Sequence, residues 1–145
     1  MDPVDHKIVA LLVENARRSY DDIGQHVSLS APAVKRRVDR LRAGGALRGF
    51  TAIVDHAALG DQTEALVELF YAPGTLLDGV AESLRGHPEV VEAWSVTGEA
   101  DAIARVRTAD NADLERVIMD LQRDGQVVRT RSQVILSALV DRTQA

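Results

Sequence analysis

Two groups of residues in this chain have types and spacing suited to ligand recognition. The first is a basic cluster of five cations within eight residues: Lys35, Arg36, Arg37, Arg40 and Arg42. Such cations neutralise phosphates, and a guanidinium can also donate two parallel hydrogen bonds to a guanine edge. The second is Gly98-Glu99-Ala100-Asp101, where glycine permits unusual backbone angles and aspartate can hold an ammonium group. A solvated helix face and an ordinary hairpin turn are the plain alternatives for these two groups.

The elements that precede the basic cluster are predicted to be two short helices. The first begins at Pro3 behind an Asp2 N-cap, and its apolar residues recur at helical spacing. The second follows Ser19, which forms a pair typical of a capping box with Asp22. Gly24 lies inside this second helix, where it costs about 1 kcal/mol relative to alanine. We expect the glycine to allow close approach of another helix.

The basic cluster itself is predicted to lie on a third helix, after the turn Ser28-Leu29-Ser30, with Ser30 as its cap. An apolar stripe of Val34, Val38 and Leu41 faces the core, and the basic face lies opposite. This placement is typical of the recognition helix of a helix-turn-helix, which enters the major groove of DNA. The residues predicted to face double-stranded DNA are Ser30, Pro32, Ala33, Lys35, Arg36, Arg37 and Arg40. Arg36 is the candidate for a base contact, and Lys35, Arg37 and Arg40 are candidates for phosphate contacts.

The charge distribution supports a DNA-binding N-terminal part. Residues 1–55 carry nine basic and seven acidic residues, whereas the remainder has a net charge of -7. Gly45 suits the end of the third helix, and residues 47–54 are predicted to form a strand, the wing of a winged helix-turn-helix. The predicted organisation is a DNA-binding domain over residues 1–55, a linker over 56–62, and a second domain over 63–145.

The second domain contains a strand–helix–strand unit twice. The predicted elements are Thr63–Tyr71, Leu76–Gly86, Val90–Thr97, Asp101–Thr108, Asn111–Arg123 and Val127–Ser137. Two such units in series predict a ferredoxin-like βαββαβ domain, and the chain is therefore of the α+β class. The sheet face without helices would carry large apolar residues, including Leu66, Phe70, Trp94 and Ile103. Because such a face is a liability when uncovered, we expect a second subunit to pack there and form a homodimer.

Several motifs, in their order and spacing, resemble the Lrp/AsnC family of bacterial and archaeal regulators. They include Asp5-His6-Lys7-Ile8, Leu29-Ser30, Val96-Thr97-Gly98-Glu99-Ala100-Asp101 and Val128-Arg129-Thr130-Arg131-Ser132. The resemblance implies a DNA-binding domain and a regulatory domain that dimerises through its sheet. It also implies assembly of dimers, often to octamers, with an amino acid or related metabolite between dimers. The effector-binding residues that it implies are Thr97, Gly98, Glu99, Ala100, Asp101, Thr130 and Ser132. Ala100 and Ala102 stand where relatives often carry larger residues, which favours a large or aromatic amino acid.

Two other function classes are alternatives to a regulator. One is an enzyme similar to the siroheme decarboxylases, and the other is an effector-independent architectural DNA-binding protein. The sequence has no cysteine, no histidine pair at metal-ligand spacing, no nucleophile motif and no phosphate loop. We therefore expect no catalytic residues, no metal, no cofactor and no enzymatic activity. No apolar run approaches 18 residues and no secretory signal is visible, so we expect a cytoplasmic protein without a membrane partner. The basic helix face favours the regulator over the enzyme.

Overall fold

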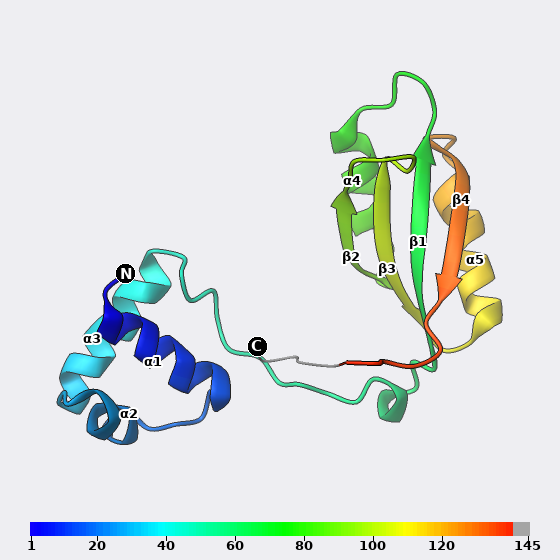
Figure 1. The fold of residues 1–145 in the computed structure, drawn as a ribbon. Helices are drawn as coiled ribbons and strands as arrows, with labels where there is room; N and C mark the ends of the chain where they lie inside the picture. The colour runs from blue at the N-terminus through cyan, green and yellow to red at the C-terminus, as the bar shows by residue number, and fades with distance from the viewer. Residues whose placement is uncertain (141–145) are drawn as a thin grey trace. The chain divides into compact units, whose positions relative to one another are not determined.

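The computed structural model describes residues 1–140, which form two compact units over residues 1–53 and 54–139 (Figure 1). The first unit contains three helices: α1 (Pro3–Glu14), α2 (Tyr20–Val27) and α3 (Ala31–Ala43). Their inward faces form one apolar core. The core residues are Ile8, Leu12, Ile23, Val34, Val38 and Leu41. The predicted helix-turn-helix is therefore confirmed, with the apolar stripe of α3 facing inward.

Side-chain caps fix the starts of the first two helices. Asp2 accepts a hydrogen bond from the backbone N–H of Asp5, and the two residues form a capping box at α1. Ser19 accepts from the N–H of Asp22 and caps α2 as predicted. The prediction for α3 is only half right, because Ser30 occupies the N-cap position but its side chain makes no capping hydrogen bond.

The reason for the glycine inside α2 differs from the predicted one. A Cβ atom at position 24 would lie 2.4 Å from the carbonyl oxygen of Leu29, in the turn before α3. The turn folds back on α2 because Ser28 adopts a left-handed conformation, with φ of 55°, and the Leu29 N–H donates to the Gly24 carbonyl at 3.0 Å. The close neighbour of Gly24 is thus the backbone of the turn and not another helix.

The predicted wing strand over residues 47–54 is wrong for the chain as described. Phe50, Ile53 and Val54 lie in an extended but unpaired segment with exposed side chains. A strand requires a partner for its backbone groups, and none of the strands described between residues 1 and 140 pairs with this segment. A short 3-10 helix, η1 (Ala57–Leu59), follows within the predicted linker.

The second unit has the predicted ferredoxin-like topology. Its elements are β1 (Thr63–Tyr71), α4 (Leu77–Arg85), β2 (Val90–Ser95), β3 (Ala102–Thr108), α5 (Asn111–Gln122) and β4 (Val127–Val134). The strands form one antiparallel sheet in the order β2-β3-β1-β4, and both helices lie on the same face (Figure 1). The helices and the sheet enclose a core that includes Val67, Leu69, Val106, Val117 and Leu121. β4 ends at Val134 and not at Ser137, because Val134 already pairs with Ala65 near the start of β1.

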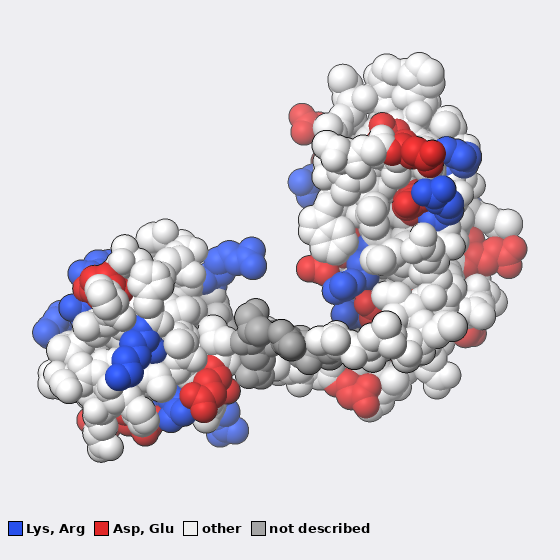
Figure 2. All heavy atoms as spheres, in the orientation of Figure 1, with Lys and Arg blue, Asp and Glu red and all other residues white. Residues whose placement is uncertain are grey.

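The helix-free face of the sheet carries charged residues that are paired with one another. Arg105 contacts Glu92 at 2.9 Å, and Arg131 contacts Glu68 on the neighbouring strand. Figure 2 shows acidic and basic groups lying close together on this unit. Trp94 remains 44% exposed on this face. Phe70, in contrast, is buried, and the Arg129 guanidinium lies 3.7 Å above its ring.

Candidate DNA-binding surface and effector loop

The outer face of α3 presents most of the residues predicted to contact DNA. Ser30, Pro32, Lys35, Arg36 and Arg40 are exposed, and Ala33 is partly exposed. Lys35 forms an ion pair with Asp39 at 2.6 Å, one turn along the same helix. Arg36 makes no hydrogen bond or ion pair within residues 1–140, so its guanidinium is available to a ligand. The assignment of DNA contacts to these residues stays a prediction.

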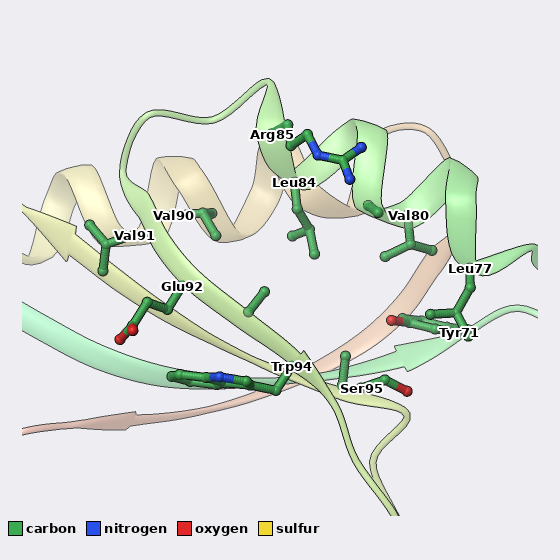
Figure 3. Close-up of a pocket in the computed structure, with 13 residues that line it drawn as sticks. Tyr71, Leu77, Val80, Leu84, Arg85, Val90, Val91, Glu92, Trp94 and Ser95 are labelled. Atoms are coloured by element: carbon green, nitrogen blue, oxygen red, sulfur yellow. The ribbon is translucent and has the colours of Figure 1, made fainter. Parts of the chain in front are cut away.

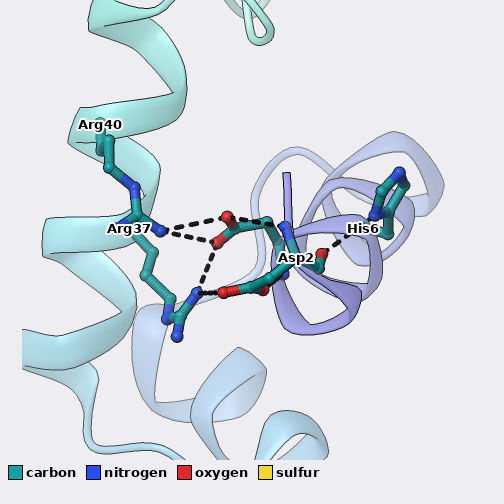
Figure 4. Close-up of polar contacts among 5 residues, drawn as sticks. Asp2, His6, Arg37 and Arg40 are labelled. Atoms are coloured by element: carbon teal, nitrogen blue, oxygen red, sulfur yellow. Dashed lines mark hydrogen bonds and ion pairs between the residues drawn. The ribbon is translucent and has the colours of Figure 1, made fainter.

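Arg37 and Arg40 differ from the other α3 cations, because both bind carboxylates of α1 (Figure 4). Arg37 Nη1 lies 2.6 Å from Asp2 Oδ2 and 2.8 Å from Asp5 Oδ1. Arg40 Nη2 lies 3.1 Å from Asp5 Oδ2. The Arg37 side chain is 26% exposed, whereas that of Arg40 is 64% exposed. Two cations predicted to contact phosphates are therefore engaged within the protein.

These ion pairs favour the charged forms of the groups that make them. The hydrogen bond from Arg37 lowers the pKa of Asp2 and the pKa of Asp5, although burial opposes the shift at Asp5. The same contacts raise the pKa of Arg37. Sequence reasoning missed this role of Asp5. The available signal was its position on the inward face of α1, three residues before Ile8, where a carboxylate needs a cation partner.

The effector loop, which we define as residues 97–101, joins β2 to β3. The Val96 N–H donates to the Asp101 carbonyl at 3.1 Å and closes the hairpin. Gly98 has φ of 118°, so the predicted use of a backbone conformation that favours glycine is confirmed. Within the described chain, the backbone N–H groups of Gly98, Glu99 and Ala100 donate no hydrogen bond. The loop therefore offers free donors to an acceptor such as a carboxylate.

The Asp101 carboxylate has one oxygen engaged in the fold. Its Oδ2 accepts a hydrogen bond at 2.8 Å from the backbone N–H of Tyr71, at the end of β1. Its Oδ1 has no hydrogen-bond partner among residues 1–140, and the residue is exposed. The contact with Tyr71 holds the carboxylate in a fixed place and leaves one oxygen free.

The predicted effector residues lie on two sides of the sheet. A hollow of about 740 Å³ adjoins the loop on the helix-free face. Its lining consists of Glu68, Ser95, Val96, Thr97, Glu99, Ala100, Ile103 and Arg131. Thr130 and Ser132 pair with the buried residues Leu69 and Val67, so they point to the helix-covered face. Ala102 also pairs with Leu69 and lies on that face. A single subunit does not bring Thr130 and Ser132 to this hollow.

A second cavity, of about 340 Å³, lies between α4 and β2 (Figure 3). Leu77, Val80 and Leu84 point into it from α4, and Tyr71 lies at one end. Its lining is largely apolar and contains none of the predicted effector residues. Among residues 1–140, no cluster of three or more His, Cys, Asp or Glu side chains could hold a metal ion. The described helices include none that is long and apolar enough to span a membrane.

Comparison with known proteins places both units in one family. Residues 1–42 match the AsnC-type helix-turn-helix domain, and residues 64–145 match the Lrp/AsnC ligand binding domain. The HTH-type transcriptional regulator Rv2324 of Mycobacterium tuberculosis is 44% identical over 142 residues, which cover 98% of this chain and 96% of the relative.

Solved structures with the same fold include two bacterial regulators. The M. tuberculosis leucine response regulatory protein LrpA has a TM-score of 0.86 at 28% identity, over 97% of this chain and 96% of that one. The Neisseria meningitidis regulator NMB0573, in complex with L-Met, has a TM-score of 0.89 at 26% identity, over 100% and 96%. The helix-turn-helix, the ferredoxin-like unit and these matches together show that the chain belongs to the Lrp/AsnC family of DNA-binding transcriptional regulators.

Proposed function

We propose that this regulator binds DNA sequence-specifically and that an amino acid bound at the effector loop modulates its DNA binding or assembly. The proposal rests on one observation: the same short loop contains free N–H groups at residues 98–100 and a free carboxylate oxygen on Asp101. In this proposal the chain acts by binding DNA and an amino acid and not by catalysis, which is consistent with a family of transcriptional regulators.

An amino acid suits the loop because it carries two opposite charges a short distance apart. The backbone N–H groups around Gly98 would bind its carboxylate, since clustered peptide donors form an anion-binding concavity. Asp101 Oδ1 would accept from its ammonium group. The similar structure of NMB0573 with L-Met supports an amino acid as the ligand class.

We further propose that a second copy of the chain completes the effector site. Thr130 and Ser132 lie on the opposite face of β4 from the hollow beside the loop. They would therefore contact an effector bound to the loop of a neighbouring subunit. This arrangement agrees with the family resemblance, which implies a ligand between dimers.

A thermal-shift screen with the common amino acids tests the effector site through two variants of Asp101. At least one amino acid should raise the melting temperature of the wild-type protein. Asp101→Asn keeps an oxygen acceptor for the Tyr71 N–H but loses the charge, so it should melt normally without ligand and lose the ligand-induced shift. Asp101→Ala should lose the shift and also about 1 kcal/mol of folding stability with the hydrogen bond. A normal ligand response in both variants would place the effector elsewhere.

The helix-free face of the sheet should make the protein at least dimeric. Trp94 is half exposed there beside Ile103 on β3, while the neighbouring charges pair within the subunit and can be covered without being left unpaired. Sedimentation at micromolar concentration should therefore give two or more chains per particle. Trp94→Glu should increase the monomer fraction, whereas Leu76→Glu, which introduces the same charge at an exposed apolar residue outside this face, should not. A monomeric wild-type protein would contradict the proposal.

We propose that the exposed face of α3 reads the DNA. Arg36 would contact a base edge, and Lys35 and Arg40 would contact phosphates, with Ser30, Pro32 and Ala33 at the same surface. A free guanidinium at the centre of the face supports the role of Arg36. The operator duplex needed for the measurements below is the sequence that the purified protein enriches from a random duplex library.

A further inference from the structure

We infer that Arg37 is a positioning residue that fixes α3 against α1, and that Asp5 and Asp2 are its anchors, so that Arg37 does not contact phosphate. The inference rests on the proposed function in one respect, namely that α3 is the helix that reads DNA. It reverses the expectation from the sequence that Arg37 contacts a phosphate.

The geometry around Arg37 is that of a structural clamp. One nitrogen, Nη1, lies between two carboxylates, 2.6 Å from Asp2 and 2.8 Å from Asp5. The Asp5 side chain is only 5% exposed, and it shares the inward face of α1 with the core residues Ile8 and Leu12. A carboxylate at such a place needs a cation, because an unpaired buried charge is strongly destabilising. Arg37 Nη1 cannot contact a phosphate without weakening these two ion pairs.

Arg40 has a different position on the same carboxylate. Its Nη2 lies 3.1 and 3.3 Å from the two Asp5 oxygens, and its side chain is much more exposed than that of Arg37. DNA could therefore draw Arg40 away while Arg37 continues to compensate Asp5. The two arginines therefore have different roles: Arg37 holds α3 against α1, and Arg40 is available to contact a phosphate.

The ion pairs of Arg37 involve the same two carboxylates that cap the start of α1. Asp2 and Asp5 form the capping box of α1, and the same two side chains bind Arg37 (Figure 4). The start of α1 is thus fastened to the middle of α3. Successive residues of a helix point about 100° apart. With Arg37 directed at α1, the neighbouring Arg36 is therefore held on the outer face, where a base contact requires it.

Removal of the Asp5 carboxylate should change DNA affinity in the direction opposite to that expected from charge alone. Removing a carboxylate near a DNA-binding face should strengthen binding if only charge matters, because DNA is a polyanion. Removing Asp5 should instead weaken binding, because α3 loses its fixed orientation. Asp39 provides a matched control, since it is an exposed carboxylate on α3 that pairs with Lys35.

The experiment measures operator-duplex affinity at several salt concentrations for Asp5→Asn, Asp39→Asn, Arg37→Gln and Lys35→Gln in the full chain. Asp5→Asn and Arg37→Gln should each lower operator affinity about tenfold, while Asp39→Asn should leave it equal or higher. Log affinity falls as log salt rises, and loss of one phosphate contact reduces the magnitude of this negative slope by about 1. Lys35→Gln should show that change, and Arg37→Gln should not.

Two outcomes would overturn the inference: tighter operator binding by Asp5→Asn, or a slope for Arg37→Gln reduced like that of Lys35→Gln. Circular dichroism identifies a variant that does not fold. If Asp5→Asn fails to fold, the salt slopes of Arg37→Gln and Arg37→Lys decide by the same criterion. Failure of the underlying DNA assignment is distinguishable, because Arg36→Ala and Lys35→Gln would then bind the operator like the wild-type protein.

Discussion

Arg36→Ala is expected to weaken binding to the operator duplex by about 5- to 150-fold, equivalent to about 1–3 kcal/mol, and to relax sequence preference at one base pair. The physical reason is that Arg36 points outward from α3 and carries no ion pair within residues 1–140. A bidentate contact with guanine would be lost and no internal contact would be gained. Fluorescence anisotropy against the operator and its single-base variants measures both effects.

Lys35→Ala serves as the comparison for Arg36→Ala on the same helix. Lys35 pairs with Asp39 at the side of the basic face, and a phosphate contact there would carry no sequence information. Loss of this contact should lower the affinity for operator and scrambled duplexes by similar factors. If Arg36→Ala also lowered the affinity for both duplexes equally, Arg36 would be a phosphate contact and the base assignment would be wrong.

Gly24→Ala should destabilise the helix-turn-helix, although alanine is the better helix former by about 1 kcal/mol. The new Cβ would lie 2.4 Å from the Leu29 carbonyl oxygen, which belongs to the backbone and cannot rotate away. Moving the turn should cost about 1–3 kcal/mol and lower the melting temperature by several degrees. Operator affinity should fall with it, because this turn sets the start of α3.

Gly49→Ala is the matched control for Gly24→Ala. A Cβ at position 49 would meet no atom within 4 Å, and its φ lies outside the left-handed region. Calorimetry of the full chain should show an unchanged or slightly higher melting temperature for this variant. An unchanged melting temperature for Gly24→Ala would show that the turn is more adaptable than its contacts indicate.

Local signals predicted the helices and the topology well. The Asp2 and Ser19 caps mark where α1 and α2 begin, because short side chains that accept backbone N–H groups depend only on nearby residues. The bounds of β1 were predicted fully, as Thr63–Tyr71, from an alternating apolar pattern that matches its alternating burial. The two one-sided helical stripes were enough to place α4 and α5 on one face of the sheet.

The errors in the fold concern contacts that the sequence pattern does not specify. Residues 47–54 have the apolar character of a strand, but strand formation depends on a partner that the described chain does not supply. The apolar pattern of β4 continues past Val134, whereas the ladder stops where β1 begins. Gly24 was correctly identified as a close-contact residue, but the identity of its neighbour depends on how the turn folds back.

The sequence predicted which residues contribute to the candidate sites better than it predicted how those residues are arranged in space. The exposed face of α3 and the conformation of Gly98 agree with expectation. The binding of Arg37 to Asp2 and Asp5 joins residues more than 30 positions apart, and helical periodicity cannot reveal such a pair. The separation of Thr130 and Ser132 from the loop hollow follows from the register of β4 against β1, which no local pattern fixes.

The most direct test of amino-acid control is the operator affinity of the wild-type protein measured with each common amino acid in turn. At least one amino acid should change the dissociation constant by about 5- to 150-fold, the usual range for coupling between two sites. The same amino acid should leave the affinity of Asp101→Asn unchanged. Operator affinity that no amino acid alters in the wild-type protein, or an equal response in Asp101→Asn, would contradict control through the effector loop.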